Sequence, residues 1–219
     1  MLLFELHNAD VRYNGRQVLA NVSLSIDQGE RVALVGKSGA GKSTLLKLFY
    51  EQQRTDAAIV PQDLGLVKPL SVFHNVYMGR LHRHRSWYNL VNLIYPLQHE
   101  KAAVKTVVDS LELGEDMLFA SVGELSGGQQ QRIAVARAIH QGGRVLLGDE
   151  PVSSVDDHQS RVVLEAISAA YQTVIIAMHD VSLALAYSNR VVGLKDGRIV
   201  MDQAAAGLES TDLDFLYRS

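Results

Sequence analysis

The feature that most constrains the fold is a glycine-rich stretch, GKSGAGKST, from Gly36 to Thr44. The apolar run RVALV comes directly before it, and TLLKLFY, which has helical character, follows. Backbone N–H groups at such a turn have no intrahelical partner, and the helix dipole adds partial positive charge. The order of strand, loop and helix around the pattern G-x-x-x-x-G-K-[ST] therefore predicts a phosphate-binding loop in an α/β fold.

A second Ser/Gly-rich turn, LSGGQ, stands directly before another predicted helix, which stops at Gly142-Gly143. By the same argument it is a second anion-binding turn. The residues that we expect to contact phosphate there are Ser126, Gly127, Gly128 and Gln129. One chain therefore carries two phosphate-binding turns.

Strands and helices alternate along the rest of the chain. The runs RVLLGDE and TVIIAMHD are apolar strands that end in polar residues, which is typical of parallel strands in an open α/β sheet. Residues 3–26 indicate two strands joined at Asn14-Gly15, and RVVGLKDGRIV a closing hairpin. We predict one α/β domain over residues 1–219: a mostly parallel sheet flanked by helices, an N-terminal antiparallel β subdomain, and an inserted helical subdomain at roughly 66–140.

Composition excludes several other classes of protein. The chain has 219 residues, a net charge of −3 and no cysteine, which argues against a broad nucleic-acid-binding surface and excludes a disulfide framework. Even the apolar run LVNLIYPL is broken by Asn92 and Pro96, far short of a membrane span. The N-terminus reaches Glu5 and Asp10 too soon for a signal peptide. We expect a soluble chain with no nucleic-acid partner and only a peripheral role at any membrane.

The residues around the first loop suit phosphate chemistry. Lys42 can reach the β and γ phosphates, and the Ser43 hydroxyl can bind Mg²⁺. Asp149 can hold Mg²⁺, and Glu150 can polarise an attacking water as general base. The loop residues predicted to bind the nucleotide are Gly36, Lys37, Ser38, Gly39, Ala40, Gly41, Lys42, Ser43 and Thr44.

Three further residues are candidates for the same site. His179 follows a predicted strand at the sheet edge that carries Glu150, where it can contact the γ phosphate or orient the water. Gln62 can supply a side-chain oxygen near Mg²⁺, although from polarity alone it is an ordinary loop residue. Tyr13 can stack on an adenine base or pack on the sheet, and the residues alone favour neither.

The most basic segment is RLHRHRSW, from Arg80 to Trp87. His82 and His84 stand two apart with arginines around them, which indicates a solvated loop rather than a metal site. Arginine and tryptophan together are typical of interfaces, so we predict a protein contact here.

With these residues assembled, the chain resembles the ATP-binding subunits of ABC transporters along nearly its whole length. The matching motifs are the Walker A loop at Gly36–Thr44, the Q-loop at Gln62, the LSGGQ signature, the Walker B strand VLLGDE, the D-loop at Ser153–Asp156 and the switch histidine His179. Tyr13 falls where the family places its adenine-stacking aromatic. The resemblance implies a P-loop NTPase core that binds ATP and Mg²⁺ and hydrolyses ATP.

The resemblance also implies an assembly. Two copies pack head to tail about a two-fold axis, so that Lys42 of one copy and Ser126 of the other face the same ATP. The other implied partners are integral membrane permease subunits and, indirectly, a substrate-binding protein. The implied location is peripheral, at the cytoplasmic face of the inner membrane.

Within the family, the stretch NVYMGRLHRHRSWYNLVNL looks most like the phosphonate importers, which implies import of phosphonate or a related phosphorus oxyanion. One alternative is a soluble ABC-type ATPase that assists a phosphonate-degrading carbon–phosphorus lyase complex. Another is a module that senses ATP without hydrolysing it, against which Glu150 and His179 argue.

The sequence departs from the family pattern in three places. The segment between Thr44 and Gln62 is short, so we expect the antiparallel sheet to be trimmed or open at its edge. Gly148 stands before Asp149 where a larger apolar residue is common. Val155 and Asp157 replace the usual D-loop leucine and the proline that often follows. None of these changes removes a catalytic group.

Overall fold

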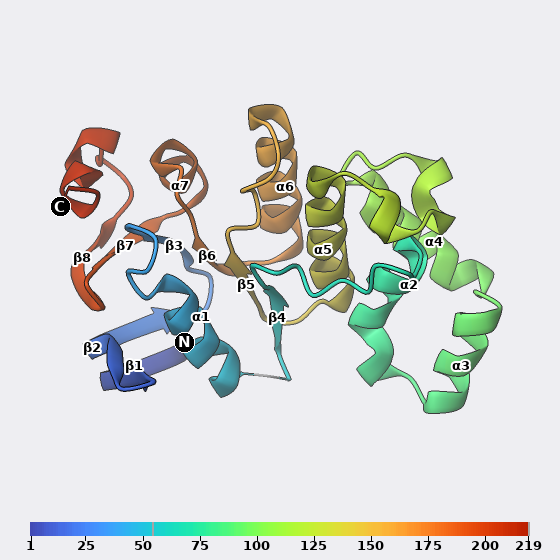
Figure 1. Cartoon of the computed structure of the whole chain (residues 1–219), viewed down its shortest axis with the longest axis horizontal. Helices are drawn as coiled ribbons and strands as arrows, with labels where there is room; N and C mark the ends of the chain where they lie inside the picture. The colour runs from blue at the N-terminus through green and yellow to red at the C-terminus, as the bar shows by residue number, and fades with distance from the viewer. Residues whose placement is uncertain (54, 219) are drawn as a thin grey trace. The chain divides into compact units, whose positions relative to one another are not determined.

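The computed structural model describes residues 1–53 and 55–218, which form two compact units. The first unit consists of residues 1–59, 144–150 and 171–219, and the second of residues 60–143 and 151–170. Figure 1 shows the elements of each unit along the chain. Within the described residues, no helix combines the length and apolar character needed to cross a bilayer.

A six-stranded sheet organises the first unit, in the order β4-β5-β6-β3-β7-β8. The strands are β3 (Arg31–Val35), β4 (Ala57–Val60), β5 (Val145–Asp149), β6 (Thr173–Ala177), β7 (Arg190–Lys195) and β8 (Arg198–Ala204). β3 pairs in parallel with β6 and β7, β5 pairs in parallel with β6, and β8 closes the edge as an antiparallel hairpin with β7. The apolar strands β3, β5 and β6 are buried almost throughout, as expected of parallel strands covered on both faces.

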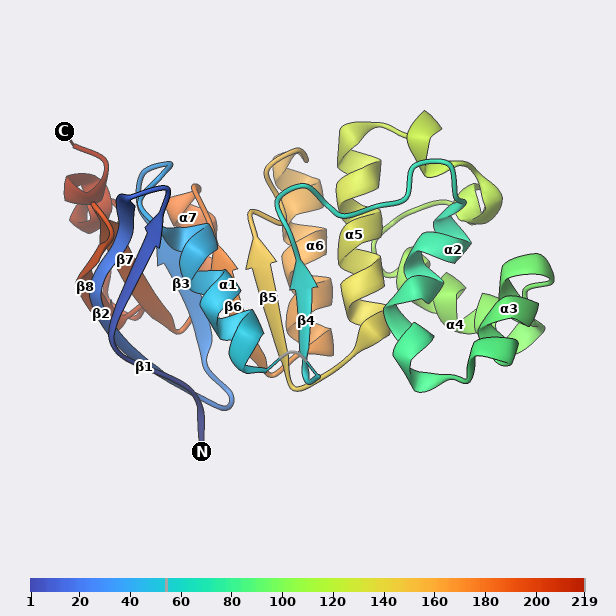
Figure 2. The same cartoon turned by 60° about the horizontal axis from the view of Figure 1, so that its bottom comes forward.

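Helix α1 (Lys42–Gln52) packs against this sheet and contacts β5 and β6 (Figure 2). Leu45, Leu46 and Phe49 recur at helical spacing and are buried in the core. The Phe49 ring lies 4.9 Å from that of Phe4, which joins the helix to the N-terminal strands. Helix α7 (Val181–Tyr187) and a 3₁₀ helix at Ser210–Leu216 complete the unit.

The N-terminal antiparallel sheet contains, among the described residues, two strands: β1 (Leu2–Tyr13) and β2 (Arg16–Asp27). The predicted turn at Asn14-Gly15 joins them, with both residues at positive φ. Within the described residues this sheet has two strands, and its trimming relative to the family pattern stays a prediction. The side chain of Gln52 donates to the Glu5 carbonyl at 3.0 Å, and that of Gln53 donates to the Leu3 carbonyl at 3.2 Å.

The second unit is helical. It contains α2 (Val72–Tyr77), α3 (Ser86–Ile94), α4 (Gln98–Asp109), α5 (Gly127–Gln141) and α6 (Asp157–Ala170), with 3₁₀ turns at Met78–Arg83, Glu115–Phe119 and Val122–Glu124. Its core lies where α2, α4 and α5 meet, and the Phe73 ring stacks on Tyr77 at 5.7 Å. This unit also includes α6, which the sequence placed in the core domain. The proposed subdomain boundary at 66–140 stays a prediction.

Candidate nucleotide-binding site

The phosphate loop links β3 to α1, and two of its glycines are required by close packing. Gly36 has φ +142°, and a Cβ there would collide with the Leu194 carbonyl oxygen. Gly41, the N-cap of α1, has φ +107°, and a Cβ there would lie 2.6 Å from the Leu19 side chain. No side chain caps α1. The first amides of the helix are therefore directed at the loop, as an anion site requires.

Lys42 is the first residue of α1, and its side chain is 5% exposed. Its ammonium donates to the Gly36 carbonyl at 2.8 Å and to the Lys37 carbonyl at 3.1 Å. Burial lowers the Lys42 pKa, and the negative charges of Glu150 and Asp149 oppose that shift. A buried cation that is hydrogen-bonded to neutral carbonyls favours an anionic ligand, because phosphate oxygens bind it more strongly.

Asp149 and Glu150 follow the end of β5 at the same sheet edge. Asp149 Oδ1 is buried and has no hydrogen-bond partner among the described residues. Burial raises the Asp149 pKa, as does Glu150, whereas a hydrogen bond from Ser43 and the nearby Lys42 and His179 lower it. A buried orphan carboxylate oxygen beside a serine hydroxyl is the oxygen donor set that Mg²⁺ prefers. These two residues fit the predicted magnesium site.

The described residues contain no cluster of three or more His, Asp or Glu positioned to hold a metal ion. Mg²⁺ usually takes only one or two carboxylates from the protein and completes its shell with water and substrate phosphates. The small donor set of Ser43 and Asp149 therefore suits a metal that arrives with its nucleotide.

The predicted base and the predicted switch residue are in direct contact. His179 Nε2 lies 2.6 Å from Glu150 Oε1, and the two side chains are 45% and 19% exposed. Glu150 adopts φ +56°, a strained conformation, and its N–H donates to the Ala177 carbonyl at 3.1 Å. Strain of this kind is typical of functional sites, since the surrounding structure must hold it in place. The structure thus brings Lys42, Asp149, Glu150 and His179 together.

Tyr13 ends β1, and its side chain is 47% exposed. The ammonium of Lys47, on α1, lies 5.9 Å from the centroid of its ring. An exposed ring favours the stacking role over packing on the sheet. That role stays a prediction.

The signature turn lies in the second unit, where it begins α5. The Ser126 hydroxyl accepts a hydrogen bond from the Gln129 N–H at 3.3 Å, and the Gln129 side chain accepts one from the Ser126 N–H at 2.9 Å. This reciprocal pair is a capping box. It leaves the amides of Gly127 and Gly128 as the N-terminal donors of α5. We predicted Gln129 as a nucleotide contact, but in this structure its side chain caps the helix.

Two residues of α5 that sequence reasoning missed position neighbouring loops. Gln131 is 2% exposed; its side chain accepts a hydrogen bond from the Ser154 N–H at 2.7 Å and donates to the Ser153 hydroxyl at 3.2 Å. Arg137 donates to the Leu64 carbonyl at 2.7 Å and also to the Gly65 carbonyl, just after the exposed Gln62. Their one sequence signal is that both are polar residues set among the apolar positions that recur along α5.

The sheet order and the uncapped loop before α1 are those of a P-loop nucleotide-binding protein. It belongs to the ABC transporter family, whose model matches residues 19–153. Among particular relatives, the chain is 37% identical to the phosphonates import ATP-binding protein PhnC 1 of Natronomonas pharaonis, over 94% of this chain and 95% of that protein. It is 36% identical to the phosphonates import ATP-binding protein PhnC 1 of Pseudomonas aeruginosa, over 94% of this chain and 87% of that protein.

A solved dimeric bacterial ABC transporter cassette has the same fold. It matches with a TM-score of 0.80 at 24% identity, covering 95% of this chain and all of that chain. The fold class and the family predicted from the sequence are therefore both confirmed. The roles of individual site residues stay predictions.

Proposed function

We propose that this chain is the ATP-hydrolysing subunit of an importer for phosphonate or a related phosphorus oxyanion. The observation that carries the proposal is that four charged or titratable side chains lie close together beside the uncapped end of α1. They are Lys42, Asp149, Glu150 and His179. The printed names of both relatives, which describe import ATP-binding proteins for phosphonates, support the substrate and the direction. They favour the importer over the soluble lyase accessory.

Each group at the sheet edge has a task in hydrolysis. The α1 amides and Lys42 neutralise charge on the phosphates, and Ser43 and Asp149 hold Mg²⁺, which supplies further positive charge when bound. Glu150 accepts the proton of the attacking water, and His179 holds the Glu150 carboxylate in place through their contact. Tyr13 stacks on the adenine ring.

We further propose that two copies share each ATP, with Ser126 and the Gly127 and Gly128 amides of one copy closing the site on the other. A two-fold dimer makes both sites from one self-complementary surface. The dimeric cassette to which this chain is similar supports that arrangement. ATP then closes the pair and hydrolysis opens it.

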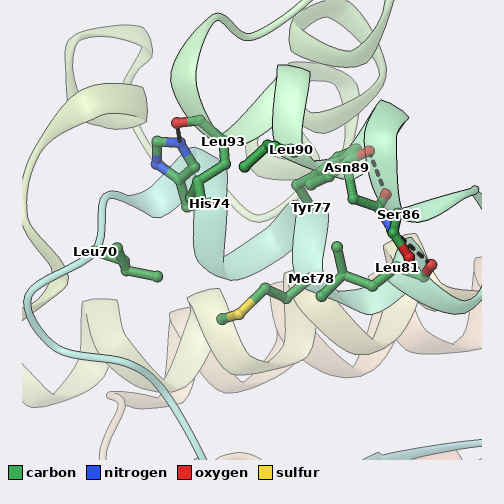
Figure 3. A pocket seen from close by; sticks show the side chains of 9 residues that line it. All are labelled: Leu70, His74, Tyr77, Met78, Leu81, Ser86, Asn89, Leu90 and Leu93. Atoms are coloured by element: carbon green, nitrogen blue, oxygen red, sulfur yellow. Dashed lines mark hydrogen bonds between the residues drawn. The ribbon is translucent and has the colours of Figure 1, made fainter.

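The permease has a candidate receiving surface in the second unit. A hollow of about 350 Å³ opens between α2, the turn at Met78–Arg83 and α3 (Figure 3). Its apolar walls come from Leu70, Tyr77, Met78, Leu81, Leu90 and Leu93. We propose that an apolar segment of the permease fills it, which would place this chain at the inner face of the membrane without spanning it.

Glu150→Gln tests the hydrolytic role. It should leave ATP binding intact, lower phosphate release about a thousandfold, and accumulate the dimer in ATP. Unchanged turnover would remove Glu150 as the base. Glu51→Gln, which neutralises an exposed carboxylate near the end of α1, is the matched control and should hydrolyse ATP normally.

Mixing two inactive chains tests the shared site. Lys42→Ala and Ser126→Arg chains should each be inactive alone, and together they should regain one intact site per heterodimer in a single-turnover assay. No recovery would contradict the shared site. Co-purification from membranes tests the permease, since recovery with enzymes of the cytosol alone would contradict the importer.

A further inference from the structure

Helix α3 has apolar residues on two adjoining sides. Leu90 and Leu93 face the hollow described above (Figure 3). Trp87, Val91 and Ile94 recur at spacings of four and three residues beside them, and are 63%, 39% and 77% exposed. Tyr95, just after the helix, is 73% exposed. We call these last four residues the α3 stripe.

Polar contacts fix a third side of α3, which carries Tyr88 and Asn92, to α4. The Tyr88 hydroxyl donates to Glu100 Oε1 at 2.8 Å, and the Asn92 side chain accepts a hydrogen bond from the Leu97 N–H at 3.0 Å. Asn92 and Glu100 are both buried. The helix is therefore held with its polar side inward and the α3 stripe outward. Exposed apolar side chains that adjoin one another, as in the α3 stripe, indicate an interaction surface, whereas single exposed apolar residues do not.

Two cations lie next to the stripe. The Lys101 ammonium, on α4, lies 6.0 Å from the centroid of the Tyr95 ring. Arg85 is the exposed N-cap of α3, directly before the stripe. This local excess of positive charge matches an anionic partner.

We propose that the α3 stripe, together with Arg85, binds the headgroup region of an anionic lipid bilayer. The hollow on the neighbouring side of α3 has the concave shape that a protein segment needs, whereas the stripe lies on the convex, outward side of the helix. A bilayer demands no shape complementarity, and it favours tryptophan and tyrosine at the boundary of an apolar surface, with arginine nearby. The proposal rests on the proposed function only for bringing the chain to a membrane.

Trp87 is the single tryptophan of the chain, so its fluorescence reports on the stripe directly. The chain alone, without permease, is titrated with vesicles of phosphatidylcholine containing 30% phosphatidylglycerol. We expect the emission to shift to the blue, and brominated acyl chains to quench it. Neutral phosphatidylcholine vesicles and 0.5 M NaCl should both weaken the effect, because charge attraction is screened by salt.

Two variants separate the apolar and charged contributions. Ile94→Ser should lower partitioning into anionic vesicles about tenfold, because one exposed aliphatic side chain no longer enters the interface. Arg85→Gln should lower it about fivefold on anionic vesicles and leave neutral ones unaffected. Val200→Ser and Arg198→Gln, which alter exposed residues of β8 in the other unit, are the matched controls and should change nothing.

Absence of a vesicle-induced shift would overturn the proposal, and so would equal effects of the control and stripe variants. A blue shift produced only by detergent-solubilised permease would also overturn it, and would assign the stripe to a protein partner. ATP hydrolysis measured without lipid is a separate readout. Failure of the proposed function therefore leaves the vesicle result intact, and failure of lipid binding leaves hydrolysis intact.

Discussion

The N-termini of α1 and α5 carry motifs of similar composition but opposite hydrogen-bonding states. Helix α1 has Gly41 as its N-cap and no side-chain cap, and a buried lysine lies beside its first amides. Helix α5 has Ser126 as its N-cap, inside a closed capping box that satisfies two backbone donors. The first is an open receptor for an anion, whereas the second is largely satisfied by its own residues.

This difference indicates that the two helix N-termini of one chain have different roles in binding ATP. An end that is uncapped and has a cation beside it binds phosphate in the single chain. An end that is already capped offers only two glycine amides, and gains little from an anion unless another site presents one. We therefore expect the α1 end to set affinity and the α5 end to act on ATP already held by a partner copy.

The strongest test exchanges glycine for alanine at each end. Gly41→Ala should lower the free energy of unfolding by about 3.5 kcal/mol, from left-handed strain and the clash with Leu19. Gly127→Ala should change it by less than about 0.5 kcal/mol, because nothing lies within 4 Å of the new methyl group. Urea unfolding measures both. Equal losses would show that the two turns are equally constrained.

The next largest expected effect is that acid destabilises α5 more than α1. Burial lowers the pKa of His140, near the end of α5, to about 4, and the charges of Arg80 and Arg83 add to the shift. Because the His140 pKa is lower in the folded chain than in the unfolded chain, the free energy of unfolding has its full value above pH 6.5. It falls by about 3 kcal/mol as the pH falls toward 4. Amide exchange at pH 4 should therefore accelerate in α5 relative to α1.

His140→Leu should remove this acid sensitivity, whereas His82→Leu, at an exposed position, should not. If both helices lose protection together in acid, in the wild type and in the His140 variant alike, the assignment to His140 is wrong.

The next largest expected effect is on the affinity of the dilute, monomeric chain for ATP. Lys42→Ala should weaken ATP binding about a hundredfold, the worth of two charge-assisted hydrogen bonds. Ser126→Arg should change it less than about twofold, because the α5 end meets ATP only across a dimer. Equilibrium titration with a fluorescent ATP analogue measures both constants. A large loss from Ser126→Arg would place both turns on one nucleotide within one chain.

The smallest expected effect is the loss of stability when the capping box at the start of α5 is removed. Ser126→Ala and Gln129→Ala should each cost about 1 kcal/mol of stability, and the double variant should cost less than their sum, because the two hydrogen bonds are reciprocal. Thermal unfolding of the three variants measures the coupling. Full additivity would mean that the box does not act as a unit.

The sequence was sufficient to predict the α/β fold, the phosphate loop and the sheet edge that carries Asp149, Glu150 and His179, because each depends on local patterns and strand direction. It did not reveal that Gln129 caps α5 or that Gln131 holds the D-loop. Both side chains are glutamines in a run of three, and their partners are chosen by the packing of α5 rather than by local sequence.

The shortened connection after α1 has a consequence for how the chain behaves among other copies of itself. An open strand edge is a template on which another chain can add a strand. Here the side chains of Gln52, the last residue of α1, and of Gln53, its C-cap, donate to two carbonyls of β1, and register shifts interrupt the pairing of β1 with β2. These two side-chain hydrogen bonds occupy β1 carbonyls with which the strand of another copy could otherwise pair, and so disfavour edge-to-edge association between copies.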